Sequence, residues 1–292
     1  MPAISPASIL AAPNLGKPWP SVMPAASRPM WHSTLLCAPG PRTWFQAADD
    51  AVAAGADAVI LADLALMEHV ATNHPGQRLH VSVQASASNV DAVSLLVESF
   101  GAKRLVLPRV LTVPEIANIA RQVDCELEVF AFGGLCVMAE GRCSLSSYIT
   151  GQSPNMQGVC SPASHVRYRE DGAEMVSELG GFTINRFGAD EPAGYPTLCK
   201  GRFHIADEDA YAFEDPVSLD VMDHLDALKA AGVTALKIEG RQRGKAYVAQ
   251  VVSQLRSALS AAPADRPAHL AQLRRLSEGQ RTTSGAYEKK WR

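Results

Sequence analysis

Four cysteines lie in the middle of the chain with a spacing of C-x6-C-x16-C-x38-C. They are Cys136, Cys143, Cys160 and Cys199. Four thiolates are the complete ligand set of a structural zinc ion or of a [4Fe–4S] cluster. The grouping therefore predicts a metal site. The alternative is that these cysteines are small, buried apolar residues, as cysteines outside disulfides often are.

Glycine and basic residues around the cysteines favour the iron–sulfur cluster. Each cysteine lies near a glycine, as in the run 133–136, and glycine allows backbone N–H groups to approach sulfur. Arg142, Lys200 and Arg202 add positive charge, which stabilises thiolates. Zinc sites more often contain closely paired cysteines, and this sequence has no such pair. The spacing alone leaves zinc open as the second interpretation.

A second group of polar residues lies on or just after predicted strands. It consists of Gln84, Arg109, Glu128, Lys237, Glu239 and Arg241. Charged side chains inside a buried strand are costly unless they are paired, so one interpretation is an internal ion-pair network. The other is a pocket for an anionic substrate. In that pocket Arg109, Lys237, Arg241 and Gln84 bind the substrate, and the catalytic Glu128 or Glu239 transfers protons.

The elements that position these residues form an alternating pattern. Buried strands are expected at 58–61, 80–83, 104–108, 126–132 and 234–241, with helices at 44–54, 64–72, 89–99, 114–121 and 246–259. Strand, helix and strand in alternation indicate a parallel sheet. No dinucleotide-binding glycine motif follows any strand, so a TIM-like (β/α) barrel is favoured over a Rossmann domain. Functional residues are then expected at the C-terminal ends of its strands.

Three parts of the chain are expected to differ in character. Residues 1–36 are rich in proline and predict an irregular or disordered extension. Residues 37–292 form the barrel-like domain and end in a polar tail. Residues 133–215 interrupt the alternation with glycine, proline, serine and asparagine, and they carry the four cysteines. We expect this stretch to be a long functional loop that a metal orders.

Composition narrows the class of protein. The net charge of −3 argues against a dedicated nucleic-acid binder, so no nucleic-acid partner is expected. No apolar run is long enough for a membrane span, and six cysteines in 292 residues do not make a disulfide scaffold. We expect a cytoplasmic protein, where clustered thiols favour metal or redox chemistry. Sequence motifs of zinc peptidases, P-loop NTPases and α/β-hydrolases are absent.

Residues 127–146 resemble the signature of the collagenase-like peptidase family, family U32. Further similar segments are 81–86, 106–111, 194–202, 237–243 and 282–287. The resemblance covers roughly residues 38–292, and within the family it is greatest to UbiU-like proteins of oxygen-independent ubiquinone biosynthesis. Proteins of that branch begin with a Cys-Pro-Ala-Gly element and two βα units. In this sequence only residues 35–40 are faintly similar to the opening element. The barrel is therefore expected to be incomplete at its N-terminus.

The resemblance implies a cofactor, partners and a reaction. It implies a [4Fe–4S] cluster on Cys136, Cys143, Cys160 and Cys199. It implies a heterodimer with a UbiV-like protein, which hydroxylates the ubiquinone ring without O2 and takes oxygen from prephenate. A UbiT-like lipid-binding accessory protein would present the precursor. The alternatives are hydroxylation of RNA bases, collagenase-like proteolysis, or a structural subunit whose cluster only orders the loop while the partner performs the chemistry.

Overall fold

The computed structural model describes most of the chain from residue 41 onward. The described residues are 9–11, 31–32, 41–138, 140, 143–154, 160–191, 193–240, 243–262, 264–277 and 281–288. Most of the predicted extension at 1–36 lies outside these ranges. Arg142 and Arg241, which the sequence analysis singled out, also lie outside them. None of the helices in the described ranges combines the length and apolarity that crossing a membrane requires.

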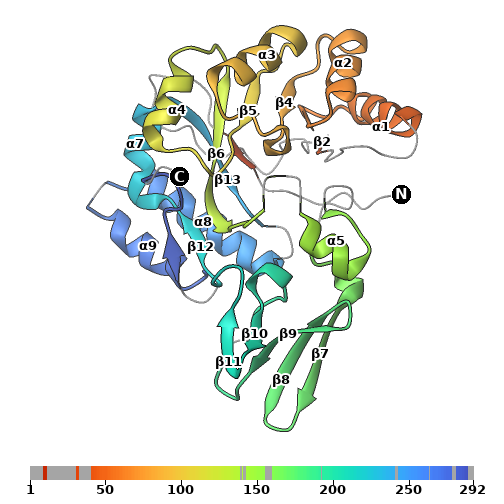
Figure 1. The fold of residues 1–292 in the computed structure, drawn as a ribbon. Helices are drawn as coiled ribbons and strands as arrows, with labels where there is room; N and C mark the ends of the chain where they lie inside the picture. Colours follow the sequence, from red (N-terminus) through yellow and green to blue (C-terminus); the bar gives the residue numbers. More distant parts are fainter. Residues whose placement is uncertain are drawn as a thin grey trace.

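In the described part of the chain, a nine-stranded sheet forms the centre of the fold, and its main path runs β1-β13-β6-β5-β4-β3-β2 (Figure 1). Its parallel strands are β2 (Trp31–His32), β3 (Val59–Leu61), β4 (Leu79–Val81), β5 (Arg104–Val106), β6 (Glu126–Gly134) and β13 (Val233–Ile238). At one edge β1 (Ile9–Ala11) pairs antiparallel with β13. The antiparallel strand β12 (Ser218–Asp220) pairs with the end of β6, and β14 (Thr282–Thr283) lies beside β12.

Helices connect the parallel strands, as the alternating pattern predicts. They are α1 (Pro41–Ala53), α2 (Leu64–Asn73), α3 (Val90–Phe100), α4 (Val113–Ala120) and, later in the chain, α7 (Leu225–Ala230). Two more helices, α8 (Lys245–Ser260) and α9 (Arg266–Arg274), follow the last parallel strand, β13. Side-chain caps fix the starts of α2 to α4. Asp63 caps α2, Asn89 caps α3, and Thr112 with Glu115 forms a capping box on α4.

The central strands are buried along their whole length, and their apolar side chains form the main core. Leu61, Val81 and Leu105 are fully enclosed, and they share one cluster with Met67 of α2 and Ile116 of α4. Strands covered in this way show continuous apolar runs instead of alternation, which is why the sequence reveals them clearly. The prediction of a mixed α/β fold with a parallel sheet is confirmed.

The barrel itself stays a prediction. The two edges of the sheet are β1 and β2, and within the described residues no pairing joins them. The described strands therefore form an open sheet, which has one edge at each end of its path.

The structure contradicts the expectation of a long loop at 133–215. This stretch holds α5 (Ser144–Thr150), an antiparallel sheet of β7 (Val166–Asp171), β8 (Glu174–Leu179) and β9 (Phe182–Phe187), and a hairpin of β10 (Arg202–Ile205) and β11 (Glu208–Tyr211). In Figure 1 these strands project away from the nine-stranded sheet. Most side chains of β7 and β11 are exposed and polar, so no apolar run marks these strands in the sequence.

The small sheet has its own core. Ile149 of α5, Leu179 of β8 and Ile184 of β9 form a second cluster, to which Val166 and Leu198 add partly buried surface. The predicted polar tail after residue 259 also contains structure, namely α9 and β14. Only Leu270 and Leu273 of α9 are buried, which is too few apolar residues for a recognisable pattern.

The C-terminal segment is fastened to the centre of the sheet by Tyr287, which is 3% exposed. Its hydroxyl donates a hydrogen bond of 2.8 Å to the carbonyl oxygen of Phe130 in β6. Its own carbonyl oxygen accepts from the Val113 N–H at the start of α4. One residue thus joins β6, α4 and the last described segment.

Removal of this hydroxyl is expected to destabilise the fold. Tyr287→Phe leaves the buried Phe130 carbonyl without its side-chain donor, so the free energy of unfolding should fall by about 1–2 kcal/mol. Urea denaturation measures this change. Tyr148→Phe is the control, because Tyr148 is 83% exposed and its loss of a hydroxyl should change little. Equal stability of the Tyr287 variant and the unchanged protein would contradict the assigned role.

Candidate functional site

The predicted strand-end residues meet where β5, β6 and β13 end. Arg109 follows β5, Gly133 and Gly134 end β6, and Glu239 follows β13. The backbone N–H of Glu239 donates to Phe132 O over 2.8 Å, so β6 and β13 remain in contact to this point. Gly133 has φ of 121°, and a Cβ there would lie 2.6 Å from the Cβ of Glu239. Only glycine fits this close approach.

Arg109 connects the segments around it. Its Nε and Nη2 donate to the two carboxylate oxygens of Glu140 over 2.9 and 3.0 Å, which is a bidentate pair. Its Nη1 donates to Gly134 O over 3.0 Å and lies 3.6 Å from Glu239 Oε2. The guanidinium also lies 4.1 Å from the centre of the Phe130 ring. The side chain of Arg109 therefore holds Glu140, between two of the cysteines, against the strand ends.

The four cysteines come from four separate positions around this edge. Cys136 follows β6, Cys143 is the N-cap of α5, Cys160 precedes η2 (Ala163–His165), and Cys199 lies in η3 (Leu198–Lys200). The charges of Cys160 and Cys136 contribute to the pKa of Cys199, and the charge of Cys143 contributes to that of Cys136. The four thiols thus belong to one electrostatic group. No disulfide joins the cysteines in the described ranges.

Specific contacts bring these segments together. Leu198 of η3 packs on the small core that contains Ile149 of α5. The hydroxyl of Tyr195 donates to Ser161 O over 2.8 Å, which joins the chain before η3 to the chain after Cys160. Lys200 Nζ donates to Val217 O over 3.2 Å. The antiparallel sheet and η3 therefore act as the scaffold of the cysteine segments.

The surroundings of the thiols combine burial with positive charge. Burial raises the pKa of Cys199 to about 12, while the neighbouring Lys200 charge lowers it. Burial also raises the pKa of Cys136, and a hydrogen bond from the Met138 N–H and the charge of Arg109 lower it. A bound metal removes the proton from such a thiol. Four thiols with adjacent cations and a backbone donor are the kind of ligand set that holds an iron–sulfur cluster.

The spacing of the sulfur atoms bears on zinc, the second interpretation. In the described part of the chain no three cysteine sulfurs lie within 4.8 Å of one another. A tetrahedral zinc ion with Zn–S bonds of about 2.3 Å places its sulfur ligands about 3.8 Å apart. The cysteine segments would have to move closer together to bind zinc.

Glu128 and Lys237 belong to a neighbouring ion-pair network inside the sheet. Glu128 is fully buried, with Lys237 Nζ at 3.4 Å and Arg104 Nη1 at 3.3 Å from its carboxylate oxygens. Arg104 also pairs with Glu126 over 2.6 Å. This arrangement matches the ion-pair interpretation of the strand residues, and the predicted proton transfer by Glu128 stays a prediction. Lys237 also contacts the ring of Phe130, which thereby links this network to Arg109.

Gln84 occupies η1 (Val83–Ala85) after β4 and is 9% exposed. Its Oε1 is buried and has no hydrogen-bond partner among the described residues. The predicted substrate contact of Gln84 stays a prediction, as does that of Arg241, which lies outside the described residues. Sequence reasoning missed Glu140 and Arg104. The signal for Arg104 is its register opposite Glu126 on the next strand, since both residues begin their strands.

The comparisons with known proteins agree on one family. The model described as "Peptidase family U32" matches residues 42–290. The chain is 35% identical to tRNA hydroxylation protein P of Haemophilus influenzae over 72% of this chain and 50% of that protein. It is 31% identical to tRNA hydroxylation protein P of Escherichia coli over 77% of this chain and 53% of that protein.

A third relative carries a different name. The chain is 30% identical to the 23S rRNA 5-hydroxycytidine C2501 synthase of Escherichia coli, over 71% of this chain and 26% of that protein. The chain spans about half the length of the two tRNA hydroxylation proteins. The resemblance to family U32 is confirmed, whereas the narrower resemblance to UbiU-like proteins is not among these findings.

Loss of the Arg109 side chain is expected to loosen the cysteine segment. Arg109→Gln removes the bidentate partner of Glu140, so the free energy of unfolding should fall by about 2–3 kcal/mol. Amide hydrogen exchange at 135–140 should become faster. The matched control is Arg169→Gln, which breaks an exposed pair with Glu178 and should change neither quantity. Unchanged exchange at 135–140 in the Arg109 variant would refute its role as the connecting residue.

The buried His80 of β4 predicts a dependence of stability on pH. Burial, and then the charges of Arg104, Arg78 and Lys237, lower its pKa from 6.5 to about 3. The unfolded state therefore binds a proton that the folded state excludes. The contribution of neutral His80 to the free energy of unfolding is fully present above about pH 6.5. It is lost toward lower pH, by at most about 1.4 kcal/mol per pH unit.

Urea denaturation between pH 7 and pH 5 tests this dependence, because most carboxylates remain ionised over that range. His80→Asn cannot take up the proton, so its stability should vary less with pH than that of the unchanged protein. Parallel pH profiles for the two proteins would show that His80 is not responsible.

Proposed function

Because the chain belongs to peptidase family U32, we propose that it is an iron–sulfur component of a hydroxylation system that works without molecular oxygen. The hydroxylation is supported by the relatives reported above, which are named for it. The iron–sulfur cofactor is supported by the four cysteine thiols near the strand ends. The single observation that carries the proposal is the Arg109–Glu140 pair. This pair joins the cysteine segment to the end of the sheet, where (β/α) proteins place their functional residues.

In this proposal Cys136, Cys143, Cys160 and Cys199 hold a [4Fe–4S] cluster. When bound, the cluster supplies electron transfer. Lys200 and Arg109 offset the negative charge of the thiolates, and the Met138 N–H donates to sulfur. Four thiol ligands from four segments also tie α5 and η3 to the end of β6.

The two predicted acids differ in how accessible they are. The side chain of Glu239 is 31% exposed, whereas that of Glu128 is fully buried between two cations. Glu239 is therefore the better candidate for proton transfer to or from a substrate. Arg109 is engaged by Glu140, Gly134 and Glu239, so its part is to position the cysteine segment. Lys237 and the amide oxygen of Gln84, which has no hydrogen-bond partner among the described residues, are the candidates for direct substrate contact.

We infer an RNA base as the first candidate substrate, since the relatives reported above are named for hydroxylation of tRNA or rRNA. This inference differs from the expectation of no nucleic-acid partner, which rested on the net charge of −3. The ubiquinone ring is the second candidate. It is supported by the resemblance in the segments around the cysteines and by the net charge. That candidate includes a UbiV-like partner, a UbiT-like accessory protein and prephenate as oxygen donor.

The cofactor is tested by anaerobic purification with analysis of iron, sulfide and zinc. We expect a brown protein that absorbs near 400 nm and contains about four iron and four sulfide per chain. Cys199→Ala should lose this absorbance. Cys125→Ala is the matched control and should keep it, because Cys125 packs against the main core. A colourless protein that contains zinc would overturn the cluster.

The substrate is tested in anaerobic cells that lack the chain. Mass spectrometry of total RNA should show the loss of a hydroxylated base, and the unchanged chain should restore it while Cys199→Ala does not. If a ubiquinone precursor accumulates while the hydroxylated RNA base is still present, the ubiquinone ring becomes the preferred substrate. If neither product depends on the chain, the hydroxylation proposal fails.

A further inference from the structure

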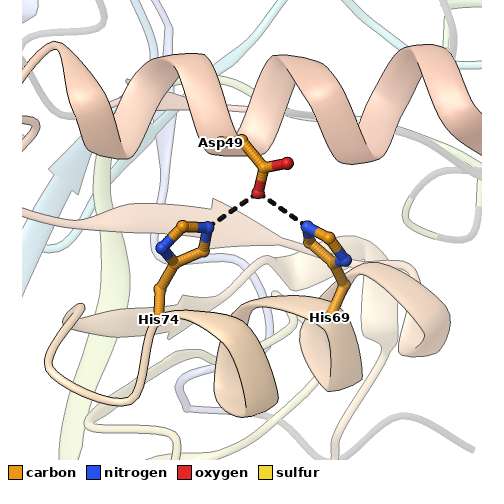
Figure 2. Close-up of side chains that lie close together, drawn as sticks. All are labelled: Asp49, His69 and His74. Carbon is orange, nitrogen blue, oxygen red and sulfur yellow. Dashed lines mark hydrogen bonds and ion pairs between the residues drawn. The ribbon is translucent and has the colours of Figure 1, made fainter.

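Three side chains with metal-binding atoms converge between α1 and α2 (Figure 2). Asp49 belongs to α1, His69 to α2, and His74 is the C-cap of α2. The Nε2 atoms of His69 and His74 each lie 2.7 Å from the same oxygen, Oδ1 of Asp49. All three atoms lie within 4.8 Å of one another, which in the described part of the chain holds for no other group of this kind.

The two helices are packed together, and local contacts fix the His69 ring. The ring of Phe45 on α1 stacks on His69, with 4.6 Å between ring centres and an interplanar angle of 11°. The side-chain nitrogen of Asn73 lies 3.2 Å from Nδ1 of His69 and donates to His69 O over 2.9 Å. Nε2 of His69 is therefore the nitrogen that faces Asp49. A ring held in this way loses little freedom when it binds a ligand.

The contacts of His74 are simpler. Its backbone N–H donates to Val70 O over 2.9 Å and closes the last turn of α2. This bond sets the position from which the ring reaches Asp49 of the neighbouring helix. The ring of His74 lies 6.1 Å from that of His69, at an interplanar angle of 66°. The two rings thus approach the carboxylate from different directions, as ligands around one ion do.

Hydrogen bonding alone explains part of this arrangement. The hydrogen bonds from His74 and then His69 lower the pKa of Asp49, so the group is a carboxylate with two imidazole donors. Metal coordination needs slightly longer separations between the same atoms. Bonds of about 2.1 Å in a tetrahedral site place ligand atoms about 3.4 Å apart. An outward movement of about 0.7 Å converts the 2.7 Å contacts into that geometry.

We propose that Asp49, His69 and His74 bind a divalent transition-metal ion, with zinc as the first candidate. Two imidazole nitrogens and one carboxylate oxygen suit zinc and leave its fourth position to water. The side chains of His69, His74 and Asp49 are 18%, 25% and 34% exposed, so an ion can enter from solvent. A metal ion binds only an imidazole nitrogen that carries no proton, so binding weakens as pH falls.

The position of this site indicates a structural function. His74 ends α2, and the chain then enters β4, so the site lies toward the N-terminal ends of the strands. The cysteines and Glu239 lie toward the opposite, C-terminal ends. An ion here would fasten α1 to α2 and take no part in chemistry at the cysteines. The proposal is therefore independent of the proposed function.

Zinc titration of the full chain tests the site. His69→Gln and His74→Gln each retain a side-chain N–H that can donate to Asp49, but an amide does not bind zinc. The unchanged protein should bind one zinc ion more than the double variant, and each single variant should bind that ion at least tenfold more weakly. Zinc that binds the cysteines is common to all variants and cancels in the comparison.

His204→Gln is the matched control. His204 also contacts a carboxylate, that of Asp209, over 3.1 Å, but it belongs to no group of three metal-binding side chains in the described ranges. This variant should bind zinc as the unchanged protein does. Zinc should also raise the melting temperature of the unchanged protein more than that of the double variant. Asp49→Asn provides an independent variant if the histidine variants fail to fold, and it too should lose the additional ion.

Equal zinc stoichiometry and affinity in the unchanged protein and the folded variants would overturn the proposal. The three residues would then form only a hydrogen-bonded clamp between α1 and α2. Cobalt provides a second readout, because a site without sulfur gives weak visible bands without thiolate charge transfer. Absence of such bands from the difference spectrum of the unchanged protein and the double variant would lead to the same conclusion.

Discussion

The guanidinium of Arg109 is the contact on which the arrangement of the strand ends depends. It forms two parallel bonds to Glu140, one to the carbonyl of Gly134, and a longer ion pair to Glu239. These partners belong to different segments, and a planar donor group can satisfy all of them at once. A lysine in this position would supply the charge but not the geometry. The cysteine segment therefore depends on one residue of the strand end for its place beside the sheet.

Buried charge is the second physical constraint on the fold of this protein. Glu128 is fully buried, and its ionised form is tolerable only because Arg104 and Lys237 lie beside it. Burial and the charges of these cations lower the pKa of the neighbouring His80, which therefore stays neutral. The interior of the sheet is thus a mixture of apolar layers and one compensated ionic layer. Such a layer specifies the register of its strands, since a shift by one residue would separate the charges.

The sequence predicts the central elements well, because buried parallel strands form continuous apolar runs and Asn89 is a clear helix cap. It does not reveal β7–β11, because most side chains of β7 and β11 face solvent and only short stretches of β8 and β9 are buried. It also does not show that Arg109 meets Glu140, or that Asp49 meets His69 and His74. Those residues are far apart along the chain, and only the packed fold brings them together. The common site of the four cysteines stays a prediction, which rests on residue type and spacing.

The pairing of β1 with β13 has a consequence for the order in which the protein folds. Strands β3 to β6 pair with their neighbours in sequence, so each addition closes a short loop. The β1–β13 pairing instead joins residues that are far apart along the chain, through three residue pairs from Ile9↔Lys237 to Ala11↔Ala235. Because closing so long a loop costs more chain entropy than closing the short ones, we expect this pairing to form after them and to open before them. When it opens, the backbone of β13 offers a ready template for a strand from another molecule.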